Sequence, residues 1–234
     1  MRARAPTEIE PCSKPGLGGA REAHGVPRLP LTALVLAVAA LPGCAAEQAE
    51  GHDPTPSAPA VRADTLAGVA RRIYHQEAGG AVGHAAVRRI ARDRALLAAL
   101  GSDNSAALRT AALRQLLNPG KHVVRLSVVR AGRALTDVGG AFVVAPAQLD
   151  VGGDLLEASM QDVVGYVKLV HRLTGAQIVV RGAPGHVESS LAAATHAALP
   201  VSGDATLAGR SYVVRSFREP GYAGESLEVW ILSR

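Results

Sequence analysis

The sequence predicts an α+β domain. In this domain, long N-terminal helices pack on an antiparallel sheet of five to six strands, and a helix follows the third strand. Residues 64–117 repeat apolar side chains at helical spacing, whereas apolar and polar side chains alternate from residue 121 onward. Hydrophobic residues make up 48% of the chain but aromatic residues only 3%. We therefore expect a core built from aliphatic side chains.

The chain has 234 residues, enough for one ordinary domain with appendages. Its net charge is +5, but residues 1–44 carry five basic and three acidic side chains, which leaves +3 on the remainder. That charge is small and scattered along the sequence, whereas nucleic-acid binding proteins carry a concentrated basic surface. No nucleic-acid partner is expected.

Residues 1–44 have the pattern of an export signal. Leu29–Leu41 is an apolar run preceded by Arg28, shorter than the roughly 20 residues of a membrane-spanning helix. The run ends in Leu41-Pro42-Gly43-Cys44, which resembles the lipobox of bacterial lipoproteins. The resemblance implies lipidation of Cys44 and anchorage to the outer face of the cytoplasmic membrane. The alternatives are a plain signal peptide with a chance cysteine and, for the start of the signal, translation from Val26.

Residues 45–62 are polar and rich in proline, so they cannot bury enough surface to fold. We interpret them as a flexible tether, and residues 63–234 as the folded domain.

Two helical regions open this domain. Asp64 is a candidate N-cap for a long helix, or two consecutive helices, that ends near Leu100, and residues 102–105 begin another that closes before Pro119. Many arginines occur in the first region. They fit either a surface for anionic lipid or a partner, or an ordinary solvated helix face, and we favour the second.

The stretch from Lys121 to Val144 predicts an antiparallel hairpin. Alternation along residues 123–129 places an aliphatic face on the first strand, and Ala131-Gly132 forms the turn. Gly139-Gly140 falls in the second strand, where glycine marks a bulge or a close approach of a helix or a ligand.

The remaining elements follow the same logic. Residues 155–160 form the third strand, after which Asp162 caps a helix that Gly175 ends. Residues 176–181 and 186–190 are a fourth strand and a short return strand, and 191–199 include a helical turn. Two final runs, 211–217 and 226–232, read as an antiparallel pair that completes the sheet.

Three segments carry a family resemblance: HVVRLSVVRAGRALTDVGGAFVVAP, SMQDVVGYVKLVHRLTG with AQIVVRG after it, and GRSYVVRSF. They resemble segments of single-Cache domains, which are PAS-like extracytoplasmic sensors, from high-GC Gram-positive bacteria. The resemblance implies binding of a small molecule, such as a carboxylate or an amino acid, on one face of the sheet. It also implies a signalling partner, here a separate sensor kinase or cyclase. The connection 145–154 is shorter than the helical insert that often roofs the pocket of such domains.

Polar groups on apolar strands and at a helix start are the candidate ligand contacts, because a few such groups fix a small ligand in an apolar cavity. An arginine fork would suit a carboxylate. The candidates are Arg125, Ser127, Asp137, Ser159, Gln161, Tyr166, Arg181 and Tyr212. Asp162, at the start of the helix after the third strand, and Lys168, on that helix, are further candidates. For each of them the alternative is an ordinary solvent-facing, capping or packing role.

We expect no metal, cofactor or catalytic site. The histidines have no His-x₃-His or HExxH spacing, and Ser189-Ser190 lacks the G-x-S-x-G setting of a nucleophile. The sequence favours a lipid-anchored, non-enzymatic ligand sensor. The alternatives are a structural or protein-interaction lipoprotein whose pocket is filled by side chains and, third, an enzyme with an unrecognised site.

The sensor hypothesis makes two structural demands. Arg125, Asp137 and Tyr212 should share a surface, and the last two strands should join the first two.

Overall fold

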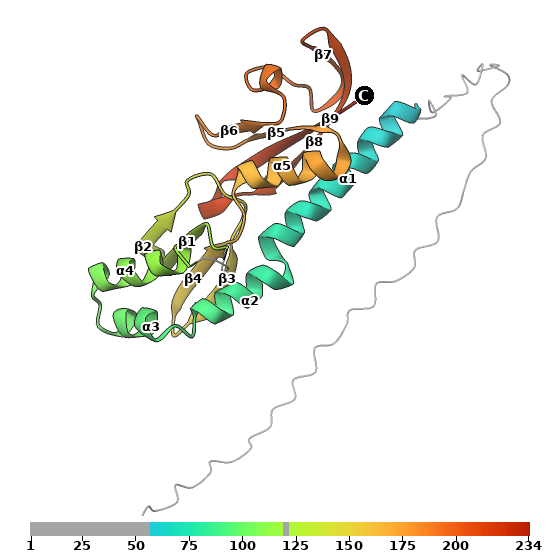
Figure 1. Ribbon diagram of the computed structural model, residues 1–234. Coiled ribbons are helices and arrows are strands. Elements are labelled where there is room, and N and C mark those ends of the chain that lie inside the picture. The colour runs from blue at the N-terminus through green and yellow to red at the C-terminus, as the bar shows by residue number, and fades with distance from the viewer. Residues whose placement is uncertain (1–56, 119–121) are drawn as a thin grey trace, which may run out of the picture. The chain divides into compact units, whose positions relative to one another are not determined.

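The computed structural model describes residues 57–118 and 122–234 (Figure 1). The predicted signal peptide, the lipidation site Cys44 and residues 45–56 of the tether lie outside the described residues.

Four helices open the folded unit: α1 (Ala58–Gly79), α2 (Ala81–Ile90), α3 (Arg94–Gly101) and α4 (Ser105–Leu116). The start of α1 corrects two predictions. Ser57 is its N-cap, so residues 58–62 of the predicted tether are helical, and a proline in the first turn suits this start. Asp64 caps nothing and instead pairs with Arg215 at 2.5 Å. Within the described residues, no helix is both long and apolar enough to cross a membrane.

The strands of the described residues, nine in all, form two antiparallel sheets. The first has the order β2 (Arg133–Gly139), β1 (Arg125–Arg130), β4 (Asp154–Ser159), β3 (Ala147–Val151). The second has the order β6 (Val187–Ser189), β5 (Gln177–Arg181), β9 (Ser226–Ser233), β8 (Arg210–Pro220), β7 (Ser202–Leu207). Helix α5 (Val163–Thr174) joins them, and short 3₁₀ turns lie at η1 (Ala192–Ala194) and η2 (Tyr222–Gly224).

The predicted α+β class, with N-terminal helices on antiparallel strands, is confirmed. The prediction of a single sheet is wrong, because β8 and β9 pair with β5 and not with β1 and β2. Helix α5 also follows the fourth strand, since β3 was missed. Alternation along a strand identifies its buried face but not the strand beside it. The last two strands therefore gave no sequence signal that they belong to another sheet.

The hairpin is confirmed. Ala131 and Gly132 both have positive φ, 49° and 78°, as a two-residue type I′ turn requires. A bulge lies between Val128 and Val129, and β2 ends at Gly139. Gly139 has φ 120°, and a Cβ there would lie 2.2 Å from the carbonyl oxygen of Val124. The close neighbours at this glycine are thus the backbone of Val124 and Arg125 and the side chain of Leu116 on α4, so the predicted close approach of a helix is found here.

Each sheet buries its apolar face against its own helices. Side chains of α2, α3 and α4 form one core with the first sheet, and α1 and α5 form another with the second sheet. A third cluster covers the opposite face of the second sheet. These clusters draw on side chains between Ala63 and Leu232. The folded unit therefore carries its own hydrophobic core.

Tyr74 on α1 connects three segments through one buried hydroxyl. The hydroxyl donates to the carbonyl oxygen of Pro220 at 2.5 Å and accepts from the backbone N–H of Ala145 at 3.1 Å. The ring of Tyr166 packs edge-on against the ring of Tyr74, with the two ring centroids 5.4 Å apart. Burial is the main cause that raises the pKa of Tyr74 to about 12.

Tyr74→Phe is expected to lower the free energy of unfolding by about 1–3 kcal/mol, because Pro220 and Ala145 each lose their partner. The folded protein keeps this phenolic proton to higher pH than the unfolded chain, so its contribution is complete below pH 10.0 and is lost as pH rises to about 12. Urea unfolding measured across this range should therefore show a shallower alkaline loss in the variant. Tyr212→Phe is the control, and an equally shallow loss there would contradict the assignment.

Candidate functional site

The first sheet has one polar face. Leu126, Val128 and Leu156 point into the core with α2–α4, so the alternate side chains point to the other side. The cross-strand register aligns four of them, Asp137, Ser127, Glu157 and Gln148, in a row across the sheet. Arg125 lies one row away on the same side. We call Arg125, Ser127, Asp137, Gln148 and Glu157 the polar face.

A buried carboxylate lies at its centre. Glu157 is 8% exposed and Ser127 only 2%. The Ser127 hydroxyl donates to Glu157 Oε2 and the Gln148 amide to Oε1, both at 2.7 Å. A charged group this deep requires such partners, because burial without them is costly. The row is therefore a fixed arrangement of donors and acceptors.

Arg125 is held beside this row by charge. Its guanidinium meets Asp137 through two hydrogen bonds, at 2.9 and 2.7 Å, which raise the pKa of Arg125. Its Nη1 donates to the carbonyl oxygens of Gly140 and Ala141. The Arg125 side chain is 18% exposed and that of Asp137 36% exposed, so solvent reaches the pair from the carboxylate side. An incoming anion would have to replace Asp137.

Tyr222 reaches this face from the other sheet. It lies in η2, between β8 and β9, and its ring is 3.8 Å from the Arg125 guanidinium carbon. Its hydroxyl donates to Asp137 at 3.3 Å, and burial raises its pKa. An antiparallel bridge between Val144 and Gly221 brings the loop into place. We call the contact of Tyr222 with Arg125 and Asp137 the Tyr222 clasp.

The structure brings together Arg125, Ser127 and Asp137 of the predicted residues, and separates the others. Tyr212 lies on the second sheet, so the expected common surface with Arg125 and Asp137 is a wrong prediction. The Ser159 hydroxyl donates to the Val144 carbonyl. The buried Tyr166 hydroxyl donates to the Ala70 carbonyl. These two side chains support packing.

The rest have other surroundings. Arg181 donates to backbone carbonyls of residues 194–197 and stacks on Trp230. Asp162 caps α5 as predicted, accepting from the N–H of Gly165 at 2.6 Å. Lys168 is exposed. Gln161 lines a separate cavity of about 370 Å³ with Glu77 and Met160.

Three members of the arrangement were not predicted. Glu157 alternates with the core positions of β4, and this signal was available in the sequence. Gln148 lies on the missed strand β3, and Tyr222 comes from a distant loop. Among the residues that the structure describes, no cluster of three or more His, Cys, Asp or Glu is placed to hold a metal ion.

No family model matches the chain, and no curated protein matches it. Two solved structures are similar: the periplasmic domain of Vibrio cholerae LuxQ, and the selenomethionine form of the same domain. The first has 12% sequence identity and a TM-score of 0.45, covering 73% of this chain and 99% of that one. The second has 12% identity and a TM-score of 0.42, covering 73% and 97%.

The hydrogen bond between Ser127 and Glu157 should be measurable in a double-mutant cycle of Ser127→Ala and Glu157→Ala. A coupling of about 1–2 kcal/mol is expected, because the acceptor is a buried carboxylate.

The matched control is Thr136→Val on neighbouring β2. Its buried hydroxyl has no hydrogen-bond partner in the part of the chain that the structure describes. This change should leave stability unchanged or raise it, with no coupling to Glu157. Coupling as large in the control as in the test cycle would contradict a specific bond.

Proposed function

We propose that the chain is an exported, lipid-anchored sensor module that binds a small molecule at the polar face and acts through a separate signalling partner. The observation that carries this proposal is a polar sheet face with a fixed buried centre, left on the side opposite α2, α3 and α4. The lipobox-like sequence at Cys44 and the resemblance of three segments to Cache-type domains support it. Because the strands form two sheets and Tyr212 lies in the second, we place the proposed site on the first sheet alone.

The chemistry of the face favours an α-amino acid or a related carboxylate. A ligand carboxylate can take the place of the Asp137 carboxylate on the Arg125 fork, while Asp137 turns to solvent. Glu157 and Gln148 lie beyond Ser127 in the row that starts at Asp137. Their side-chain oxygens can accept hydrogen bonds from a ligand ammonium group. Because one carboxylate replaces another, the net gain is a difference between two similar interactions, and we expect modest affinity.

Displacement of the Tyr222 clasp would accompany this exchange, since Tyr222 contacts both members of the pair. The loop that carries Tyr222 continues into Pro220, which Tyr74 fixes to α1. A ligand on the first sheet would thereby alter contacts of the second sheet and of α1. A separate sensor kinase or cyclase is the partner that this arrangement would address.

A second candidate function, a protein-interaction lipoprotein, is favoured by the filled hydrogen bonds of Arg125. Its fork is already occupied by Asp137 and by two backbone carbonyls. In that case the polar face is a docking surface and takes no small ligand.

The two functions separate in a thermal-shift screen of amino acids and organic acids. A ligand that binds only the folded state stabilises it by about 2.7 kcal/mol at a hundredfold excess over its dissociation constant. We expect an amino acid or carboxylate to raise the melting temperature, and Arg125→Ala to abolish the shift. Arg130→Ala is the matched control. Arg130 lies on the same strand as Arg125, at the hairpin end, and also pairs with a carboxylate, that of Asp154 on β4.

A shift retained in Arg125→Ala would remove the polar face as the site. A screen without any shift would favour the docking function.

A further inference from the structure

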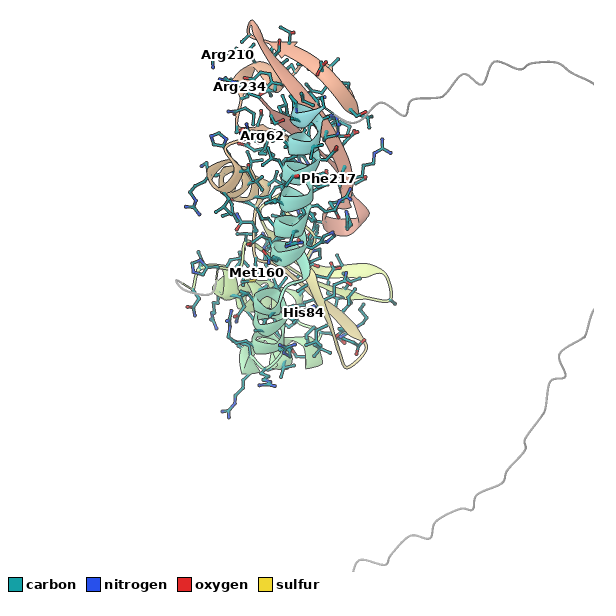
Figure 2. All side chains as sticks on the ribbon, turned by 90° about the vertical axis from the view of Figure 1, so that its right-hand side faces the viewer. Arg62, His84, Met160, Arg210, Phe217 and Arg234 are labelled. Carbon is teal, nitrogen blue, oxygen red and sulfur yellow. The ribbon has the colours of Figure 1, made fainter. Side chains whose placement is uncertain are left out.

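A pocket lies at the end of the folded unit where α1 begins. It has a volume of about 280 Å³, and its lining includes Arg62 of α1, Gln177 of β5, Tyr212 of β8, and Ser233 and Arg234 at the end of β9. Figure 2 shows Arg62, Arg234 and Arg210 at this same end. We call this the basic end pocket. It is separate from the polar face, because its strands belong to the second sheet.

The charged side chains in the lining of this pocket are both basic. Its lining contains two arginines and no aspartate or glutamate. Arg234 donates to the Tyr212 hydroxyl at 3.2 Å and lies over that ring, so its partner is neutral. Arg215 and Arg71, by contrast, pair with Asp64 and Glu219. The basic end pocket thus offers guanidinium donors that a tetrahedral anion can use.

This pocket lies beside two helices, α1 and the C-terminal end of α5. Arg62 lies in the second turn of α1, whose N-cap Ser57 makes no side-chain cap and whose first turn holds no acid. Helix α5 ends at Gly175 and brings a partial negative charge. Arg172 in its last turn opposes that charge.

The position of the pocket indicates where the anion comes from. Twelve residues, 45–56, separate Cys44 from the start of the described chain at Ser57. Fully extended, such a segment reaches at most about 40 Å. If Cys44 carries the lipid, as the proposed function holds, this end of the domain stays within that distance of the bilayer surface.

We propose that the basic end pocket binds the phosphate of an anionic phospholipid headgroup. Arg62 and Arg234 would clasp the phosphate oxygens, and Leu66 and Leu232, which also line the pocket, would contact the glycerol. This inference rests on the proposed function for its geometry but uses none of the residues of the polar face. The contact would orient the anchored domain on the membrane.

The test uses the chain from Ala45 onward, which lacks Cys44 and therefore any anchor, and which retains the complete hydrophobic core. Its partition onto phosphatidylcholine vesicles with about 30% phosphatidylglycerol is compared with partition onto pure phosphatidylcholine. The variant is Arg62→Gln with Arg234→Gln. The control is Arg88→Gln with Arg89→Gln, which removes the same charge from exposed positions on α2.

We expect the unchanged chain to bind the anionic vesicles. The partition coefficient of the pocket variant should be lower by about tenfold or more. The control should change binding by less than about twofold. Equal losses in both variants would indicate unspecific attraction and overturn the proposal, as would absence of binding to anionic vesicles. Glycerol 1-phosphate that binds the pocket as tightly as the vesicles do would assign it to a free phosphoester instead of a lipid.

The outcome is distinguishable from failure of the proposed function. Vesicle binding is measured without the anchor, and the pocket variant should retain any ligand-induced thermal shift that depends on Arg125. Loss of that shift together with vesicle binding would mean that the variant is damaged. Arg62→Lys with Arg234→Lys, which keeps the charge but not the guanidinium donors, should then restore the thermal shift and part of the vesicle binding; vesicle binding no stronger than in the glutamine variant would count against the pocket.

Discussion

The Tyr222 clasp is the contact on which the proposed coupling between the two sheets depends. Helices α2–α4 cover only the apolar side of the first sheet, so its polar side needs a cover that tolerates charge. An aromatic ring over a guanidinium, with its hydroxyl on the paired carboxylate, meets that need. Because Tyr222 comes from the β8–β9 loop, the same contact also joins the two sheets. Tyr74 fixes that loop to α1 at Pro220, and so extends the connection to the N-terminal helix.

Local elements could be predicted because their signals are local. The turn at Ala131-Gly132 and the caps of α5, Asp162 and Gly175, need only neighbouring residues, and all three are confirmed. Strands β3 and β7 were missed because both are edge strands with few buried side chains. The division into two sheets could not be foreseen, since strand pairing across long connections is decided by which apolar faces the helices cover. The export signal and Cys44 stay predictions.

The candidate site divides along the same line. Arg125, Ser127 and Asp137 come from one hairpin, so alternation alone places them together, as the structure does. Tyr212 and Arg181 were grouped with them only through the assumption of one sheet, and they lie in the other. Tyr222 could not be found from the sequence, because it reaches the first sheet through a loop of the second.

The central claim is that the polar face of the first sheet receives a ligand by exchange with the Tyr222 clasp. Two-dimensional amide NMR of the domain, titrated with free amino acids and carboxylates, tests it most directly. We expect shifts that begin in β1, β2 and β4 and include the amides of residues 221–224. Shifts confined to other elements, or none at all with every compound, would contradict it.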